Sequence, residues 1–491
     1  MVVARCQSAG ERLTYVKTKI IATIGPASES PEVLRALIGA GADVFRLNLA
    51  HGTPDWRTMV VEAIRRVSLE MARPIGILAD LAGPKIRLET LPGDCICCTT
   101  GSRFEFVRCA DPADPFKLTC TYEKLVDELN IDDCVLLADG TVSMRVVEKH
   151  ADAGRVVCVV EQGGEIRSRQ GVNLPGAALS TPALTDKDRG DVEWAIRNGV
   201  DFIGLSFVRS ADDVRQLRTA IDDLKPVFDP LIVAKIEKME AVSQLDQILE
   251  ITDAVMVARG DLGVEVDLAL VPIFQKRIIK VCNQHRIPVI TATQMLDSMQ
   301  NNRRPTRAEA ADVANAVLDG SDAIMLSGET AAGKYPVEAV ATMSHIAHEA
   351  ERLLSLTHAA DSQSELRKRA LAVTEAVTLG AGLAAEHLNA DLIVVATHSG
   401  KSALAVSRQR NPIPILGLSD QAATVRRMCL HWGVTPLEAQ IANVTPQELL
   451  KFVVDWGRRE KVLQSGSKLV LVASSNWSAE GHDLLLVHAI P

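Results

Sequence analysis

The stretch Pro74–Arg87, PIGILADLAGPKIR, shows the pattern on which the fold is built. Its first half is apolar on both faces, which is typical of a parallel strand covered by helices on both sides. The strand is expected to surface at Asp80, and a Gly-Pro pair then breaks it. One carboxylate and two cations, Lys85 and Arg87, therefore stand around a breaker at the end of a buried strand.

The same pattern of a short apolar run followed by a helical segment recurs along the chain. Helices are predicted at residues 31–40, at 306–318 and from 336 onward, each with Pro or Thr near its start. Eight alternating strands and helices close a (β/α)8 barrel, so a TIM barrel of the α/β class is predicted. The eight strand runs are KTKIIATIG, ADVFRLNLA, PIGILADL, DFIGLSFV, LIVAKIE, AVMVARGDL, PVITATQ and DAIMLS.

Two regions interrupt or follow this rhythm. From about residue 85 to 182, alternating runs such as CVLLADGTVSMRVVE and GRVVCVVEQGG predict antiparallel strands of an inserted β domain. After a polar stretch, THAADSQSELRKR, the strands DLIVVAT, IPILGLS and KLVLVAS predict a C-terminal α/β domain. The predicted organisation is an N-terminal segment 1–16, barrel residues 17–84, an inserted domain 85–182, barrel residues 183–355 and a C-terminal domain 356–491.

Composition and charge limit the function. The 491 residues are 47% hydrophobic and 23% charged, which describes a globular protein of several domains. A net charge of −9 argues against a nucleic-acid partner but leaves room for a local basic pocket that binds a small phosphorylated ligand. No apolar run approaches the ~18 residues of a membrane helix, and the N-terminus lacks a signal-peptide core. No membrane partner and a cytoplasmic location are expected.

Seven of the ten cysteines lie between Cys95 and Cys158. They do not form two C-x-x-C motifs, and so long a chain does not need a disulfide framework. We interpret them as reduced thiols, with a soft-metal or redox role as the alternative.

Polar and charged residues gather at the predicted carboxyl ends of the strands, where barrels of this type carry their catalytic groups. Small polar residues are common at any wet strand end, whereas charges among apolar strands persist when they are paired, metal-bound or used. This concentration predicts a functional site. The strand ends carry Thr23, Arg46, Asn48, Asp80, Ser206, Lys235, Glu237, Arg259, Asp261, Thr293, Ser327 and Glu329.

Two of these carboxylates are candidate metal ligands. Glu237 and Asp261 offer hard oxygen donors suited to Mg2+ or Mn2+, and the chain has no His-x-x-x-His or cysteine cluster for zinc. Lys235 stands two residues before Glu237, so both side chains lie on the same side of their strand. A lysine and a bound metal would then face one anionic substrate.

The motifs around these residues together resemble the pyruvate kinase family. The resemblance runs in order from about residue 17 to 351. It implies transfer of the phosphoryl group of phosphoenolpyruvate to ADP, which yields ATP and an enolpyruvate that is protonated to pyruvate in the last step of glycolysis. It also implies a β-barrel lid inserted after the third strand of the (β/α)8 barrel, an α/β regulatory domain and a homotetramer. The motifs are TKIIATIGPAS, RLNLAHG, DLAGPKIR, VAKIEKMEAV, VMVARGDLGVEV, PVITATQMLDSM and RPTRAEAADVANAVLDGSDAIMLSGETAAGKYPVEAV.

The resemblance implies catalytic roles for the matching residues. Lys235 resembles the lysine that neutralises the phosphoryl group in transfer, a step that needs charge neutralisation and positioning above all. Glu237 and Asp261 resemble the ligands of the divalent metal. The backbone around Gly260 and Asp261 would hold the substrate carboxylate together with Thr293, whose hydroxyl also stands where a water-linked proton reaches the enolate carbon.

The same resemblance implies phosphate-binding residues. Arg46 is similar to a catalytic and substrate-binding arginine of the family. Asn48, His51 and Arg87 resemble, with Arg46, the groups that bind the phosphates of phosphoenolpyruvate and ADP. Ser327 and Glu329 either shape a proton path or form a supporting polar network at the barrel mouth.

Three positions depart from the family pattern. Ala50 stands where members often have Ser, so one oxygen that helps to bind K+ is absent. Gln170 replaces a lysine near the nucleotide phosphates. Lys85 occupies a position that is often acidic in K+-requiring members. We interpret Lys85 as an internal cation in place of K+, which would then not be required; the alternative is a solvated lysine at a hinge.

The C-terminal domain contains a candidate effector loop in the segment ATHSGKSALAVSRQR. A strand ends there in a polar loop that opens a helix, a place where backbone amides can bind an anion, although a Ser cap explains Ser402 nearly as well. In the family such a loop resembles the phosphate pocket for an activating effector. The loop residues are Thr397, Ser399, Gly400, Lys401 and Ser402.

Two alternative functions account for part of this pattern. A different metal-dependent barrel enzyme, such as a lyase or aldolase, would share Glu237 and Asp261 but has no need for the inserted domain or for GPKIR. A non-catalytic scaffold on this fold is expected to have lost Lys235, Thr293 or one of the two carboxylates, and all four residues are present.

Overall fold

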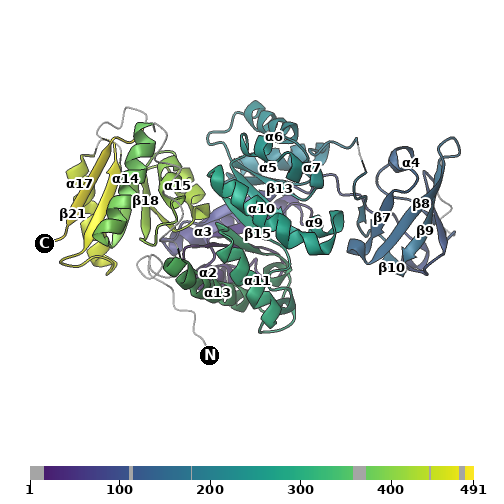
Figure 1. Ribbon diagram of the computed structural model, residues 1–491, viewed down its shortest axis with the longest axis horizontal. Coiled ribbons are helices and arrows are strands. Elements are labelled where there is room, and N and C mark those ends of the chain that lie inside the picture. Colours follow the sequence, from purple (N-terminus) through teal and green to yellow (C-terminus); the bar gives the residue numbers. More distant parts are fainter. Residues whose placement is uncertain (1–15, 110–113, 178–179, 358–371, 442–443, 475–480) are drawn as a thin grey trace.

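The computed structural model describes residues 16–109, 114–177, 180–357, 372–441, 444–474 and 481–491. Figure 1 shows three bodies in a row, with the barrel in the centre, the inserted domain at one end and the C-terminal domain at the other. Residues 1–15 of the predicted N-terminal segment and residues 358–369 of the polar stretch lie outside the described part of the chain.

Eight parallel strands form a closed barrel in the order β1-β16-β15-β14-β13-β12-β3-β2. Each one lies within a run that the sequence identified, so the prediction of a (β/α)8 barrel is confirmed. The residues of these strands are almost all buried, as is expected of strands covered by helices and filled inside by side chains. The strands are β1 (Lys19–Thr23), β2 (Val44–Asn48), β3 (Gly76–Asp80), β12 (Phe202–Leu205), β13 (Leu231–Ile236), β14 (Ala254–Ala258), β15 (Val289–Ala292) and β16 (Ala323–Leu326).

The outer helices begin where the sequence predicts. Helix α2 spans Pro31–Ala40, with the Ser30 side chain capping its first turn and Pro at its start. Thr306 and Glu309 form a capping box at the start of α11 (Arg307–Leu318). The other barrel helices are α3 (Pro54–Glu70), α5 (Asp186–Arg197), α6 (Ala211–Asp223), α7 (Met239–Ser243), α8 (Leu245–Leu249), α9 (Arg259–Glu265), α10 (Val271–Gln284), α12 (Gly328–Ala331) and α13 (Pro336–Thr357).

The inserted domain is made of strands around its own core. One sheet has the order β11-β7-β8-β9-β5-β6, and β10 pairs with β4 in a second sheet. The β barrel that the family resemblance implied is thus found, in the described residues, as two sheets and not as one closed ring. Two register shifts between β8 and β9 bend the larger sheet. The elements are β4 (Cys95–Cys98), β5 (Arg103–Val107), β6 (Lys117–Leu118), α4 (Leu125–Glu128), β7 (Cys134–Leu137), β8 (Val142–His150), β9 (Arg155–Gln162), β10 (Gly164–Arg167) and β11 (Val172–Asn173).

The C-terminal domain is an α/β sheet in the order β19-β18-β17-β20-β21, in which only β21 is antiparallel to its neighbour. Three of its strands match the predicted runs, whereas β19 and β21 were not predicted. Its elements are α14 (Val373–Leu388), β17 (Leu392–Ala396), α15 (Lys401–Ser407), β18 (Ile415–Ser419), α16 (Ala422–Arg427), β19 (Val434–Glu438), α17 (Pro446–Arg459), β20 (Lys468–Ala473) and β21 (Leu484–Ala489).

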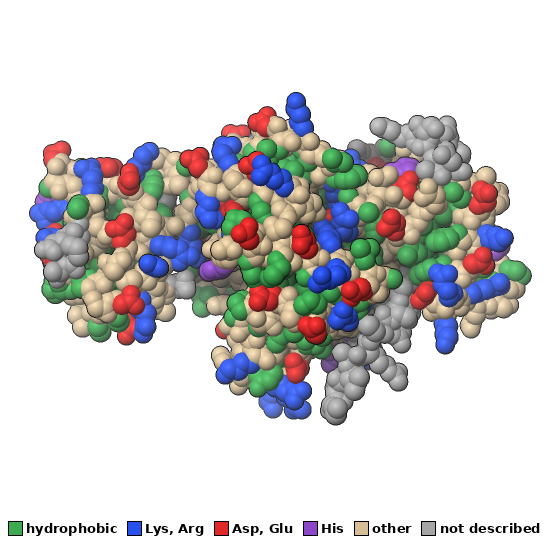
Figure 2. Space-filling model, turned by 180° about the vertical axis from the view of Figure 1, so that it is seen from behind, with side chains coloured by type: hydrophobic (Ala, Val, Ile, Leu, Met, Phe, Trp, Pro, Cys, Tyr) green, Lys and Arg blue, Asp and Glu red, His purple; other side chains and the backbone are tan. Residues whose placement is uncertain are grey.

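The surface carries mixed charge. Figure 2 shows acidic and basic side chains interspersed over one face of all three bodies. No helix of the described residues is both long and apolar enough to span a membrane. The seven cysteines of the inserted domain are all free thiols, and only Cys97 and Cys109 among them are exposed.

Candidate active site

Arg46 and Asp80 form a buried pair at the carboxyl end of the barrel. They come from the neighbouring strands β2 and β3. The Arg46 Nε and Nη2 atoms donate to Asp80 Oδ2 at 2.8 and 2.6 Å, and Nη1 donates to Thr23 Oγ1 at 3.1 Å. The Asp80 carboxylate and the Thr23 hydroxyl therefore hold the guanidinium in a fixed direction.

Lys235 joins this pair from β13. Its Nζ lies 3.4 Å from Asp80 Oδ1 and 2.8 Å from Glu237 Oε1, and it donates to Ser206 Oγ at 2.7 Å. Burial lowers the pKa of the Lys235 ammonium, but the carboxylates of Asp80, Glu237 and Asp261 outweigh burial and hold that pKa above its usual value. Lys235 is thus a buried and permanently charged cation.

Asp80 is the acidic partner of both cations. Burial raises the pKa of its carboxyl group, but the Lys235 ammonium and the Arg46 guanidinium outweigh burial, so the pKa lies below its usual value. Its Oδ1 atom is buried and accepts no hydrogen bond. A Cβ on Gly204 of β12 would meet this atom at 2.8 Å, so a side chain at that position would crowd the Asp80 carboxylate.

Glu237 and Asp261 meet beside Lys235. Glu237 follows β13 and accepts a hydrogen bond from the backbone of Phe207 at 2.9 Å, while Asp261 lies in the short helix α9. Burial raises the pKa of Glu237, and the Asp261 carboxylate raises it further against the opposing effect of Lys235. Two hard oxygen donors that repel each other fit a divalent cation.

These two carboxylates would bind only part of a metal's coordination shell. Among the described residues no group of three or more His, Cys, Asp or Glu side chains is arranged to hold a metal ion. Mg2+ in proteins is commonly bound by one or two carboxylates and completes its shell with water and substrate oxygens. The donor set at Glu237 and Asp261 agrees with that chemistry.

Gly260, which precedes Asp261 in α9, lies next to Thr293. The Gly260 amide donates to Thr293 Oγ1 at 2.7 Å. Thr293 has a φ of 70°, a left-handed conformation that is rare for a β-branched residue and turns its side chain toward α9. Arg259 supports this turn, because its Nη2 atom donates to the Thr293 carbonyl at 2.7 Å.

Asn48 ends β2, and His51 lies in the loop that follows. The Asn48 side-chain oxygen accepts a hydrogen bond from the Ala50 amide at 3.1 Å, and the His51 side chain is exposed. Arg57, which is buried, donates to the carbonyls of Leu49 and His51 at 2.5 and 3.1 Å. A buried arginine from the next helix therefore shapes the loop, and the sequence analysis missed it because nothing in α3 marks Arg57 as different from a surface arginine.

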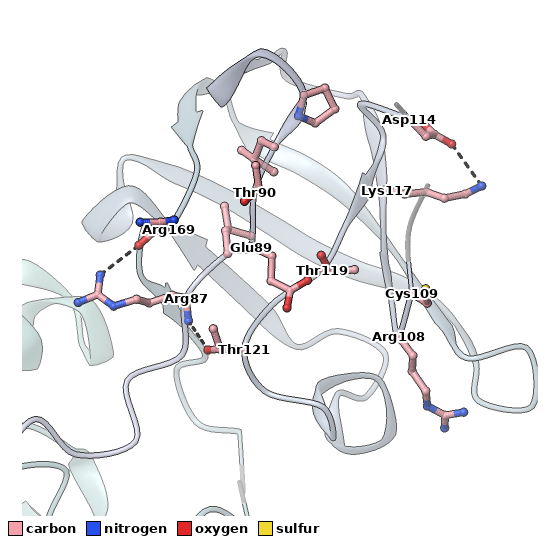
Figure 3. A pocket seen from close by; sticks show the side chains of 13 residues that line it. Arg87, Glu89, Thr90, Arg108, Cys109, Asp114, Lys117, Thr119, Thr121 and Arg169 are labelled. Atoms are coloured by element: carbon pink, nitrogen blue, oxygen red, sulfur yellow. Dashed lines mark hydrogen bonds and ion pairs between the residues drawn. The ribbon is translucent and has the colours of Figure 1, made fainter. Parts of the chain in front are cut away.

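Arg87 and Lys85 lie on the inserted domain and not among the strand ends. Arg87 Nη1 donates to the Arg169 carbonyl at 3.0 Å, and Figure 3 shows the Arg87 and Arg169 side chains close together at the edge of a pocket. Lys85 is exposed, with no hydrogen bond or ion pair of its ammonium to any other described residue, and its stem lies beside Gly171. The Gln170 oxygen accepts a hydrogen bond from the Arg167 amide at 2.7 Å, so this side chain stabilises the turn.

Ser327 and Glu329 belong to a supporting network. The two Glu329 oxygens accept hydrogen bonds from the Leu296 and Ser327 amides at 3.1 and 2.7 Å. Burial raises the pKa of this carboxyl group. Because both oxygens accept hydrogen bonds from backbone amides, Glu329 fits a supporting polar network at the barrel mouth better than a proton path.

In the candidate effector loop, several groups are already bonded inside the domain. The Gly400 amide donates to Thr397 Oγ1 at 3.1 Å, and Ser402 Oγ pairs with His482 Nδ1 at 2.8 Å. Ser399 accepts a long hydrogen bond of 3.4 Å from the Lys401 amide, and the Lys401 side chain is exposed. Of the five predicted residues, Ser399 and Lys401 are the ones that face outward with polar groups available.

The closed barrel and this cluster define a class of protein, a metal-dependent (β/α)8 enzyme that acts on a small anionic substrate. The family model described as pyruvate kinase, barrel domain matches residues 15–340, and the model described as pyruvate kinase, alpha/beta domain matches residues 375–488. The chain belongs to the pyruvate kinase family. It is a phosphotransferase that transfers the phosphoryl group of phosphoenolpyruvate to ADP and yields pyruvate and ATP.

Curated relatives agree over nearly the full length. A pyruvate kinase of Geobacillus stearothermophilus is 42% identical over 478 residues, which cover 96% of this chain and 80% of that protein. One of Bacillus licheniformis is 40% identical over 474 residues, with the same two coverages. One of Methylorubrum extorquens is 39% identical over 471 residues, or 95% of each chain. The lyase or aldolase alternative is therefore rejected.

Proposed function

We propose that Lys235 neutralises the phosphoryl group while it moves from phosphoenolpyruvate to ADP. The observation that carries this proposal is its buried ammonium, which three carboxylates keep charged. Phosphoryl transfer depends on positioning and on neutralising the charge of the moving group. A permanent cation at the strand ends suits that task, because it needs no rearrangement at the moment of reaction.

Glu237 and Asp261 are the proposed ligands of Mg2+, and the same oxygens would accept Mn2+. The raised pKa of Glu237, caused by burial and by Asp261, supports this, since a bound cation removes the repulsion between the two carboxylates. When bound, the metal supplies additional positive charge next to Lys235.

Thr293 and the backbone at Gly260 and Asp261 are proposed to hold the substrate carboxylate. Their closeness supports this: the Gly260 amide donates to the Thr293 hydroxyl at 2.7 Å, and a substrate carboxylate would accept hydrogen bonds from both groups in place of this contact. Transfer leaves the enolate of pyruvate. Its methylene carbon gains a proton from a water that Thr293 orients, the enolate oxygen becomes the carbonyl oxygen of pyruvate, and the water is left as hydroxide. Thr293 is thus proposed to act in the second half of the reaction.

Arg46 is proposed to bind the phosphate of phosphoenolpyruvate, since Asp80 and Thr23 fix the direction of its guanidinium. The nucleotide phosphates are assigned to Asn48 and His51 on the barrel and to Arg87 on the inserted domain. Arg87 lies on the inserted domain and not among the strand ends, which supports a role for that domain as a lid that brings Arg87 to the nucleotide on closing. Arg169 beside Arg87 offers a second guanidinium in place of the lysine that Gln170 replaces.

Lys85 is proposed to supply the positive charge that K+ supplies in K+-requiring relatives, and K+ is then not required. Two contacts support an incomplete K+ site: Asp80 Oδ1 lies 3.4 Å from the Lys235 ammonium, and the Asn48 oxygen already accepts a hydrogen bond from the Ala50 amide. Lys85 follows the Gly83 hinge, so closing of the lid would move its ammonium toward the barrel mouth.

The domain bounds 1–16, 17–84, 85–182, 183–355 and 356–491 are kept as part of the proposal, with a cytoplasmic location. A phosphorylated effector is proposed at the loop that contains Ser399 and Lys401.

A homotetramer is proposed from two apolar surfaces on each chain. One is the edge strand β21, where Leu485 and Val487 are 38% and 49% exposed, and its open edge can pair with a second copy. The other surface consists of Leu268, Leu270 and Ile273.

Binding of Mn2+, measured by electron paramagnetic resonance, tests the metal assignment without any turnover. Asp261→Asn is expected to weaken Mn2+ binding by about tenfold or more, because it removes one of two anionic ligands. Asp319→Asn, a carboxylate at the end of α11 that pairs with Lys276, is the matched control and is expected to bind Mn2+ as the wild type does. Equal Mn2+ affinity of Asp261→Asn and wild type would remove Asp261 from the site.

A further inference from the structure

The inserted domain is joined to the barrel by two chain segments that each contain a glycine in a left-handed conformation. Gly83 has a φ of 66° and precedes Pro84, and Gly176 has a φ of 72° and follows Pro175. A stiff residue next to a permissive one is a suitable hinge. The two hinges lie far apart in the sequence, so a single rigid-body movement of the lid requires that they move together.

Phe207 is packed against the first hinge. A Cβ on Gly83 would meet the Phe207 ring at 2.6 Å, which shows how closely the backbone lies on the ring. Phe207 itself has a φ of 58°, an uncommon conformation for a bulky residue. Its backbone amide donates to Glu237 at 2.9 Å. The first hinge therefore rests on a side chain whose backbone is bonded to a proposed metal ligand.

Lys238 connects this ring to the second hinge. Its ammonium lies 5.9 Å from the centre of the Phe207 ring, in the range of a cation–π interaction, and pairs with Glu265. The side chains of Lys238 and Glu265 are only 15% and 3% exposed. Burial raises the pKa of the Glu265 carboxyl group, and the Gly176 backbone lies close enough to oppose that effect together with Lys238. Glu265 ends the short helix α9, which also carries Asp261.

We propose that Lys238 is a positioning residue that fixes both hinges of the lid at once. One ammonium holds the ring under Gly83 and the carboxylate that faces Gly176. Phe207, Lys238 and Glu265 are here called the hinge clamp. The Phe207 amide bonds to Glu237, Lys238 follows Glu237 in the chain, and Glu265 shares α9 with Asp261, so the clamp sets the lid angle from the metal end of the barrel. The proposal rests on the lid role assigned above and deepens it.

Hydrogen–deuterium exchange of the ligand-free full chain tests the hinge clamp. In Lys238→Met the amides of peptides covering Gly83 and Gly176 are expected to exchange about two- to fivefold faster than in wild type, although Lys238 bonds to neither glycine. Glu265→Gln is expected to do the same, because Lys238 is then no longer held over the ring. Lys238→Arg keeps the charge and should restore slow exchange at both hinges.

The matched control is Lys276→Met. Lys276 lies on the outer helix α10, and its ammonium pairs with Asp319 at the end of α11. It should leave both hinge peptides unchanged. Faster exchange at Gly176 alone, or at neither hinge, in both Lys238→Met and Glu265→Gln would overturn the proposal, since an ordinary local ion pair affects only its own neighbours. The exchange measurement involves no turnover, so its result is separate from the catalytic roles proposed for Lys235 and the metal ligands.

Discussion

Replacing Lys235 with Met removes the charge at the centre of the site and keeps most of the side chain's length. The ammonium that is lost lies 2.8 Å from Glu237, 3.4 Å from Asp80 and 2.7 Å from Ser206. If the ammonium contributes ~3 kcal/mol to the stability of the transition state, kcat should fall by about two powers of ten. The KM for phosphoenolpyruvate should change much less, because Arg46 still binds the phosphate.

The same change also affects folding. Breaking a buried ion pair typically costs about 3–5 kcal/mol when one charge is left behind. The loss should be at the lower end here or below it, because Asp80 keeps its bond of 2.6 Å to Arg46 and Glu237, with a pKa already raised by burial, can take up a proton. Urea unfolding measures this loss independently of activity. Lys276→Met, which removes an exposed ammonium, is the control; it should leave kcat unchanged and cost less stability than Lys235→Met, because Asp319 keeps its hydrogen bond from Gln275.

The assay couples pyruvate formation to a second enzyme at saturating ADP and Mg2+. Exchange of the methyl hydrogens of pyruvate with solvent should survive in Lys235→Met, because the proton is proposed to come from the Thr293 side. A folded Lys235→Met enzyme that transfers phosphate at the wild-type rate would refute the role of Lys235.

Four further predictions concern the rest of the molecule. Wild-type activity with Mg2+ should rise by less than about tenfold, equivalent to ~1.4 kcal/mol, when K+ is added. Lys85→Glu should lower the activity and create a response to K+. A larger response of the wild type would exclude Lys85 as the internal cation. Small-angle scattering should detect a more closed lid with Mg2+ and nucleotide than without, whereas identical curves would contradict gating. Asp322→Ala should lower the free energy of unfolding by about 3–5 kcal/mol in urea, because it strands Arg408 and Arg410 between barrel and C-terminal domain, and a loss below 1 kcal/mol would be contrary to this account. Val487→Lys should lower the oligomeric state in analytical ultracentrifugation, and an unchanged sedimentation coefficient would argue against pairing at β21.

The sequence was sufficient for the barrel because its signal is local and repeated. A run such as PIGILA is apolar on both faces in a way that only a strand between two layers requires, and eight such runs determine the topology. The edge strand β21 was missed because its alternating exposure is a weak pattern next to a polar tail. In the inserted domain the strands were predicted, but their division into two sheets depends on bulges and pairings between distant residues.

The candidate site was partly predictable for the same reason. Parallel strands bring Arg46, Asp80 and Lys235 to one end of the barrel, so their meeting followed from the topology. Which oxygen each cation would contact did not follow, because it depends on strand register and on neighbours such as Ser206. The position of Arg87 was not predictable either, since it depends on the lid angle, which we propose is set by the hinge clamp and which the pattern of the lid strands does not encode.

The central claim is that this chain uses the buried cation cluster to pass a phosphoryl group from phosphoenolpyruvate to ADP. The most direct measurement is the amount of pyruvate and ATP formed by the purified chain from phosphoenolpyruvate and Mg2+, with and without ADP. The account predicts that pyruvate forms only when ADP is present and that ATP appears in equal amount. Failure to form pyruvate with ADP, or formation of pyruvate without matching ATP, would contradict it.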